Sequence, residues 1–182
     1  MLSRRVLFAI ILFVVAGSNV SRSQDHKVAV QVKLSHDKVA AGSAIHAMVI
    51  VGIHDGWHIN SATPSDENQI ESVVSIKAID GIGIDTMRYP PGVLRDFGFS
   101  DVPLDVYEGS VNILVTLHAA EQTKPGKYLI PMSLAYQACN DNICLAPTSV
   151  TIDVPLEVVA AGEDGIPINQ ELFKSYLEEN HR

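Results

Sequence analysis

The sequence has few cysteines, and their pattern excludes several kinds of site. Its 182 residues contain two, Cys139 and Cys144, with four residues between them. The absence of Cys-x-x-Cys-His excludes covalently attached haem, and the absence of Cys-x-x-Cys excludes a thioredoxin-type active site. The pair has no neighbouring histidine or methionine that would complete a metal-ligand set, so we expect no metal and no other cofactor. A copper or zinc site that adds His54 and His58 is the alternative.

Long apolar runs are scarce as well. The run at 6–16 follows two arginines, is too short to span a bilayer, and is followed by small residues. This pattern predicts a secretory signal peptide over residues 1–23, with cleavage after Ser18 or Ser23. Neither cleavage position has a cysteine nearby to which a lipid could be attached. We therefore expect an exported protein, periplasmic or otherwise outside the cytosol, that is soluble once the signal peptide is removed.

Basic residues are too few for a nucleic-acid-binding protein. The formal net charge is −8, and removing the signal peptide would also remove three arginines. An acidic domain argues against nucleic acid or an anionic membrane as a partner. About 160 residues remain, enough for one domain with a sizeable core. We expect that domain at 24–162, followed by a linker and an amphipathic helix at 163–182.

The remaining chain reads as short strands with turn signals between them. Apolar residues alternate with polar ones in several stretches, and the run at 45–53 is almost continuously apolar, which is typical of a strand covered on both faces. Regularly spaced strands with almost no helical pattern predict an all-β fold, an antiparallel sandwich. The alternating stretches are 28–34, 74–78, 84–89, 111–117, 128–136 and 150–158.

Two segments depart from this pattern. The segment 93–108 lacks clean periodicity but carries Phe97 and Phe99 among Gly, Asp, Ser and Pro, and a long irregular segment in a compact domain is usually functional. The alternative is that both rings fill the core. At the C-terminus, Asn169 could cap a short helix whose apolar stripe must dock on the sandwich or on a partner. The stripe consists of Leu172, Phe173, Tyr176 and Leu177.

The two cysteines lie at the mouth of a predicted hairpin. Three of the four residues between them are Asn-Asp-Asn, which favours a reversing turn. The cysteines could then face each other across the strands at a distance that a disulfide can span. Cys139 falls on the less apolar face of its strand, so we expect it to be reachable from outside.

Such a disulfide could be a structural staple or a redox site. An exported domain favours the staple. The bridge, however, would close a loop of about six residues and contribute only about 2 kcal/mol, which a domain with this much apolar strand does not need. Asp141 is the single charged residue between the cysteines. A pair without a neighbouring cation is poorly suited to attack first, but its disulfide could be attacked by a partner's thiol.

Four motifs occur in order along the chain, and together they resemble the N-terminal periplasmic domain of the thiol:disulfide interchange protein DsbD. The resemblance extends from about residue 26 to residue 159. It is strongest at the cysteine hairpin. The motifs are Gly56-Trp-His-Ile-Asn60, Tyr89-Pro-Pro91, Phe97-Gly-Phe-Ser100 with Tyr107-Glu-Gly109, and Tyr136-Gln-Ala-Cys139 with Cys144-Leu-Ala-Pro147.

The resemblance implies an immunoglobulin-like β-sandwich that relays electrons by thiol–disulfide exchange. The donor would be a membrane-linked thioredoxin-like protein, and the acceptors would be exported disulfide isomerases and thiols of cytochrome c maturation. The chain would then be one component of a protein-disulfide reductase system. Because this chain ends after one helix, the reductant would come from a separate polypeptide. The alternative is a non-catalytic binding module with a structural disulfide.

The resemblance also assigns roles to residues. Cys139 and Cys144 match the redox pair, and Cys144 matches the cysteine that forms mixed disulfides with partners. Phe97 matches the aromatic cap over the pair, with Phe99 beside it, although the cap sequence and the cysteine spacing differ from those of well-known members. Tyr136, Trp57 and His58 would support the site. Trp57 could equally be a core aromatic at a strand end.

Overall fold

The computed structural model describes residues 27–66 and 68–180, and the predicted signal peptide lies outside them. The described residues form twelve strands and one helix. In chain order these are β1 (Val28–Leu34), β2 (Val39–Ala40), β3 (Ala44–Ile53), β4 (His58–Asn60), β5 (Val73–Ile76), β6 (Ile82–Arg88), β7 (Val93–Arg95), β8 (Leu104–Tyr107), β9 (Ser110–Ala119), β10 (Gly126–Tyr136), β11 (Ala138–Cys139), β12 (Thr148–Val159) and α1 (Gln170–Asn180).

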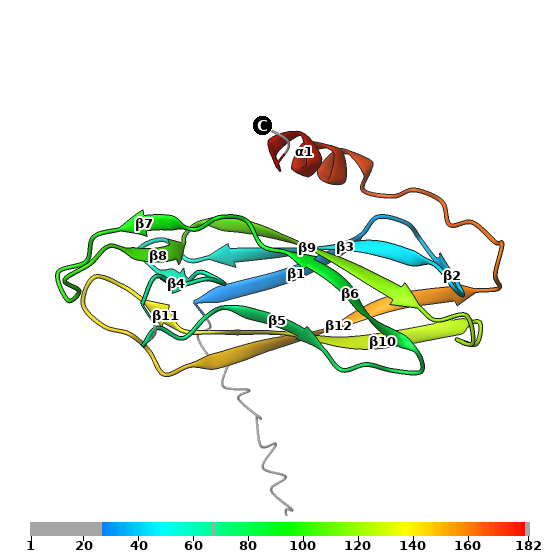
Figure 1. Ribbon diagram of the computed structural model, residues 1–182, viewed down its shortest axis with the longest axis horizontal. Coiled ribbons are helices and arrows are strands. Elements are labelled where there is room, and N and C mark those ends of the chain that lie inside the picture. Colours follow the sequence, from blue (N-terminus) through cyan, green and yellow to red (C-terminus); the bar gives the residue numbers. More distant parts are fainter. Residues whose placement is uncertain (1–26, 67, 181–182) are drawn as a thin grey trace, which may run out of the picture.

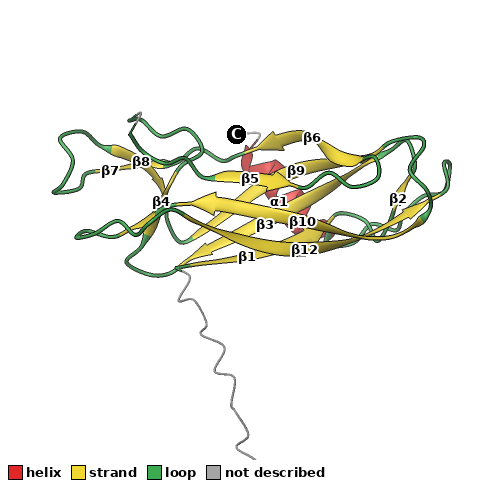
Figure 2. Ribbon diagram, turned by 90° about the horizontal axis from the view of Figure 1, so that it is seen from below, coloured by secondary structure: helices red, strands yellow, loops and turns green. Residues whose placement is uncertain are grey.

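The strands form three four-stranded sheets. The first sheet has the order β1-β3-β9-β6 and the second the order β2-β12-β10-β5. These two pack face to face as an immunoglobulin-like β-sandwich (Figures 1 and 2). The third, with the order β11-β4-β8-β7, lies at one end of the sandwich and is called the end sheet below (Figure 1, left). Apart from the parallel pair β2–β12, neighbouring strands are antiparallel, which confirms the predicted architecture.

The sandwich core forms because alternate residues of each long strand point inward. Odd-numbered residues of β3 and β9 face even-numbered residues of β10 and β12, and the twelve residues at the centre of this interface are each at most 2% exposed. This confirms the alternation predicted from the sequence. The inward residues include Ala47, Val49, Val51, Ile113, Val115, Leu117, Ile130, Met132, Leu134, Val154, Leu156 and Val158.

Helix α1 covers part of the outer face of the first sheet (Figure 1). Met48 and Leu114 point away from the sandwich core and pack with Tyr176 of the helix in a second, smaller cluster. Met48 is fully buried as a result. This explains why the run at 45–53 is apolar on both faces, and it confirms that the helix docks on the sandwich.

The start of the helix differs from the prediction. The backbone carbonyl of Asn169 accepts a hydrogen bond from the Leu172 N–H, but its side-chain amide donates to the Leu34 carbonyl at 2.8 Å. Asn169 has a positive φ of 53°, and its side chain is used to attach the helix start to β1. The predicted side-chain cap is therefore wrong. None of the described residues forms a helix long and apolar enough to cross a membrane.

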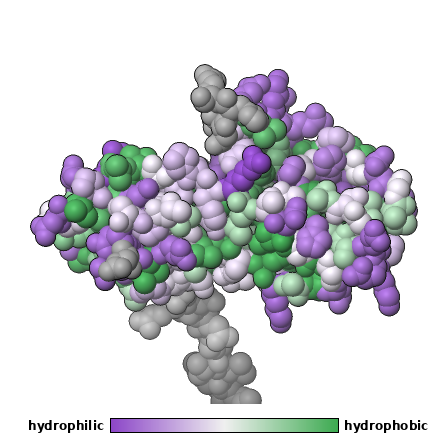
Figure 3. Space-filling model, viewed as in Figure 1, coloured by the Kyte–Doolittle hydropathy of each residue, from purple (hydrophilic) through white to green (hydrophobic). Residues whose placement is uncertain are grey.

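The segment 93–108 is less irregular than the sequence indicates. It contains β7 and β8, which pair antiparallel from Val93↔Val106 to Arg95↔Leu104, with a loop at 96–103 between them. All three residues of β7 are exposed, so no alternating pattern marks the strand in the sequence. Figure 3 shows hydrophobic groups on the surface at this end of the molecule (left). Five exposed apolar residues belong to the end sheet and its loops: Val93, Leu94, Phe99, Val102 and Ile143.

Candidate functional site

The two cysteines form a disulfide in the connection between β10 and β12. The ladder between these strands ends at the pair Tyr136–Thr148. Beyond it, Cys139 and Cys144 face each other as an isolated antiparallel bridge, with their Cα atoms 4.0 Å apart. The disulfide expected from the spacing is therefore present, at the end of the molecule where the end sheet lies.

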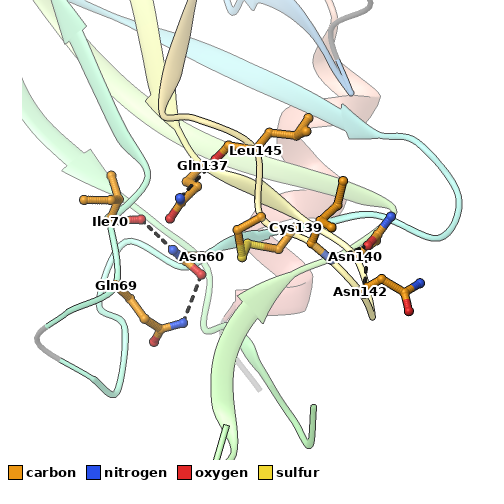
Figure 4. Close-up of a disulfide and its surroundings, with 10 residues drawn as sticks. Asn60, Gln69, Ile70, Gln137, Cys139, Asn140, Asn142 and Leu145 are labelled. Atoms are coloured by element: carbon orange, nitrogen blue, oxygen red, sulfur yellow. Dashed lines mark hydrogen bonds between the residues drawn. A yellow bond between two sulfur atoms is a disulfide. The ribbon is translucent and has the colours of Figure 1, made fainter. Parts of the chain in front are cut away.

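The turn between the cysteines is held by its own hydrogen bonds (Figure 4). The side-chain oxygen of Asn140 accepts from the backbone N–H groups of Asn142 and Ile143, both at 2.9 Å. Outside the bridge, the Leu145 N–H donates to the Ala138 carbonyl at 2.9 Å. This confirms the turn predicted from Asn-Asp-Asn. The loop therefore has local support besides the disulfide.

The two cysteines differ in exposure. Cys139 is 3% exposed, whereas Cys144 is exposed. The expectation that Cys139 is reachable from outside is therefore wrong. The alternation of β10 ends at Tyr136, after which Ala138 and Cys139 leave the second sheet and pair with β4 of the end sheet. This change of sheet turns Cys139 inward and leaves Cys144 as the accessible member of the pair.

His58 lies directly opposite Cys139 in the β4–β11 ladder. Opposite residues of an antiparallel pair have Cβ atoms about 4.5–5.5 Å apart and side chains on the same face. His58 is 3% exposed, and its Nε2 has no hydrogen-bond partner among the described residues. Burial lowers the pKa of His58 below its ordinary value of 6.5, while the charges of Glu108 and Asp141 act to raise it. The ring is therefore mostly neutral at pH 7.

The two phenylalanines of the 96–103 loop stack in sequence onto this histidine. The Phe97 ring lies 4.2 Å from the His58 ring, centroid to centroid and with 25° between the planes. Phe99 stacks on the other side of Phe97 at 5.2 Å. Phe97 is half-buried and Phe99 is 49% exposed, and neither belongs to the two core clusters of the described residues. The alternative that they fill the core is therefore wrong.

A cavity of about 310 Å³ opens beside His58 and Phe97. Its wall is acidic, and one of its carboxylates, Glu108, pairs with Arg95 of β7 at 2.9 Å. The wall consists of His54, Asp55, Gly56, Trp57, His58, Phe97, Glu108, Gly109 and Asp141. Within residues 27–66 and 68–180, no group of three or more His, Cys, Asp and Glu side chains is placed to hold a metal ion.

The other two expected support residues occupy different positions. Trp57 lines this cavity, packs against the core and has the Lys27 Nζ 5.1 Å from its ring centroid. The position of Trp57 thus fits both alternatives, a residue that supports the site and a core aromatic at a strand end. Tyr136 is 1% exposed at the end of β10, inside the sandwich core, where burial raises the pKa of its hydroxyl.

Two polar residues near the site were not identified from the sequence. Asn60 of β4 is 3% exposed; its amide donates to the Ile70 carbonyl at 2.8 Å and accepts from Gln69 at 3.0 Å (Figure 4). These bonds attach the 61–72 loop to the end sheet. Glu108 lines the same cavity as His58, and its charge acts to raise the pKa of that histidine. Both residues stand inside motifs that carried the resemblance, but their partners come from distant parts of the chain.

Comparison with known proteins matches one family. The family described as "Thiol:disulfide interchange protein DsbD, N-terminal" matches residues 22–156. No curated protein matches the chain. Among solved structures, the N-terminal periplasmic domain of ScsB from Proteus mirabilis has a TM-score of 0.57 at 12% identity, over 87% of this chain and 55% of that chain. At this identity the likeness bears on the fold alone.

Two structures from Neisseria meningitidis are also similar. The reduced DsbD N-terminal domain has a TM-score of 0.46 at 17% identity, over 70% of this chain and 85% of that one. The complex between the DsbD N-terminal and the PilB N-terminal domains has a TM-score of 0.44 at 14% identity, over 83% of this chain and 95% of that one.

Proposed function

Because the chain belongs to the family of N-terminal domains of the thiol:disulfide interchange protein DsbD, we propose that its Cys139–Cys144 pair relays reducing equivalents between two thioredoxin-like proteins. The donor is a membrane-linked dithiol protein, and the acceptor is an exported protein with a disulfide, such as an isomerase or a component of cytochrome c maturation. The relay acts in the periplasm or another exported compartment, as one component of a protein-disulfide reductase system.

The observation that carries this proposal is the unequal exposure of the two cysteines. Thiol–disulfide exchange requires a thiolate to reach one sulfur in line with the bond that breaks. Exposed Cys144 offers that sulfur to a partner. Buried Cys139 is protected from other thiols and remains beside Cys144, ready to restore the bridge. A purely structural bridge has no need of this asymmetry.

The reduction half of the relay proceeds in two exchanges. A thiolate of the donor attacks the Cys144 sulfur, the bond to Cys139 breaks, and Cys139 leaves with the electron pair and takes up a proton. The second donor thiol then attacks the donor sulfur of the mixed disulfide and releases Cys144. The donor dithiol becomes a disulfide, and the pair becomes two thiols, a transfer of two electrons and two protons. The same steps in reverse reduce the acceptor.

The structural staple remains the competing function, and the reduction potential separates the two. Structural bridges of secreted proteins usually have potentials below about −300 mV, whereas cycling bridges lie higher. We expect the Cys139–Cys144 bridge, equilibrated with glutathione or thioredoxin redox buffers, to have a reduction potential above about −300 mV. A bridge that stays oxidised below about −300 mV would assign the protein to the binding-module alternative.

Trapping experiments test the division of roles. Cys139→Ala keeps the exposed thiol and removes the one that resolves the mixed disulfide, so incubation with an oxidised thioredoxin-like protein should accumulate a covalent complex. Cys144→Ala should accumulate little complex, and the double variant none, as seen on non-reducing gels. A complex with Cys144→Ala alone would reverse the roles of the two cysteines.

A further inference from the structure

We propose that His58 is the base that removes the proton from the Cys139 thiol when the disulfide re-forms. The inference rests on the proposed relay and adds a residue to its second half. It is carried by the position of His58 opposite Cys139, by the burial of both side chains, and by the unpartnered Nε2.

The need for a base follows from the burial of Cys139. In the reduced domain, Cys144 attacks the acceptor disulfide, and Cys139 must then attack Cys144 to release the reduced acceptor. A thiol is a weak nucleophile until its proton has left. At 3% exposure, Cys139 has little contact with water that could take this proton. A basic atom inside the protein would solve the problem.

The position of the His58 ring and the direction of its pKa shift both suit it to act as this base. Its ring is on the same face of the ladder as Cys139, and stacking by Phe97 restricts its orientation. Because burial lowers the pKa of His58, the ring is in its neutral, proton-accepting form at pH 7. The charges of Glu108 and Asp141 would stabilise the imidazolium once it forms.

The charged groups around His58 come from several elements. Glu108 follows β8 and is paired with Arg95 of β7. Asp141 lies in the cysteine loop, and His54 and Asp55 lie in the turn before β4. Of these groups, Glu108 and Asp141 favour the protonated ring, in opposition to its burial.

Re-formation of the bridge passes one proton through His58. The Cys139 Sγ–H bond breaks, its proton moves to His58, and Sγ forms a bond with the Cys144 sulfur. The bond between Cys144 and the acceptor sulfur breaks, and the acceptor leaves as a thiolate that takes the proton from the imidazolium. The pair is oxidised to a disulfide, the acceptor is reduced to a dithiol, and His58 returns to its neutral form.

A stopped-flow experiment with 5,5′-dithiobis(2-nitrobenzoate) isolates this step. Mixing the reduced protein with this reagent releases one thionitrobenzoate when Cys144 is modified and a second when Cys139 restores the bridge. We would record both phases from pH 5 to 9 for the unmodified protein, His58→Phe and the control His118→Gln. His118 is an exposed histidine on β9, paired with Ala44 and Gly83 in the sandwich.

We expect the second phase of the unmodified protein to be nearly independent of pH above about 6.5 and to slow below the His58 pKa. In His58→Phe, the second phase at pH 7 should be about 10²-fold slower. It should accelerate about tenfold per pH unit and approach the unmodified rate at high pH, because hydroxide then replaces the base. The first phase, and both phases of His118→Gln, should match the unmodified protein.

Other outcomes overturn the inference. If the second phase is equally fast in the unmodified protein and in His58→Phe, His58 has a structural role at most. The same holds if the second phase of His58→Phe is slower by the same factor at every pH. If His58→Phe does not fold, His58→Gln and the pH profile of the unmodified protein decide: a second phase that rises tenfold per pH unit throughout leaves no role for the base. A second phase that never occurs in the unmodified protein would overturn the relay itself.

Discussion

Strands β3, β9, β10 and β12 of the sandwich run for ten to twelve residues, whereas the four strands of the end sheet have two to four. The sandwich buries aliphatic side chains between its two sheets, where a continuous core forms. The end sheet instead buries a histidine, an asparagine and one half of a disulfide, and it exposes several apolar residues. Stability is concentrated in the first region, and chemically useful groups are concentrated in the second.

The two regions are connected so that the first positions the second. β4 follows β3 after a short turn, and β11 follows β10 after a single residue. Both strands therefore enter the end sheet from the ends of long, fully paired strands. This arrangement places Cys139 opposite His58 without requiring the end sheet to be stable alone, since strands this short are marginal by themselves. The comparison predicts that substitutions in the two regions separate stability from thiol reactivity.

The largest expected loss of stability comes from the sandwich. Leu117 of β9 is fully buried in the core, so Leu117→Ala should lower the free energy of unfolding by about 2–5 kcal/mol, through lost burial and the cavity it leaves. Urea denaturation would measure the loss. The rate at which dithiothreitol reduces the bridge in the native protein should stay unchanged. A markedly faster reduction would show that the core and the site are not separable.

The same contrast explains what could be predicted from the sequence. Long strands with one buried face carry enough repeats of the two-residue period to be recognised, as in 111–117 and 128–136. β4 and β11 are too short to show a period. Extending the alternation of β10 through Cys139 therefore predicted the wrong face for that residue. The approach of His58 to Cys139 depends on pairing across 81 positions, which no local pattern contains.

An intermediate loss of stability is expected when the disulfide is removed. Cys139→Ser with Cys144→Ser should fold and lose less than about 3 kcal/mol, because the bridge closes a short loop that its own hydrogen bonds also support. Thermal unfolding and near-ultraviolet circular dichroism would check this, with the reduced unmodified protein as the matched control. A variant that behaves as a molten globule would mean that the end sheet depends on a structural staple.

The smallest loss of stability, with the clearest change in reactivity, is expected at Phe97. The ring is half-buried and stacks on His58, outside the two core clusters of the described residues, so Phe97→Ala should cost about 1 kcal/mol. Because the ring would act as a lid that a docked partner displaces, its removal should speed reduction of the Cys139–Cys144 bridge by dithiothreitol several-fold.

Leu94→Ala is the matched control for this variant. Leu94 is 63% exposed on β7, in the same hairpin, so its removal also takes an apolar side chain from that surface but leaves the Phe97–His58 stack in place. It should change neither the unfolding temperature nor the reduction rate appreciably. An equal acceleration in both variants would point to a general loosening of the hairpin. An unchanged rate in Phe97→Ala, with a loss of several kcal/mol, would instead make Phe97 a structural residue of the end sheet.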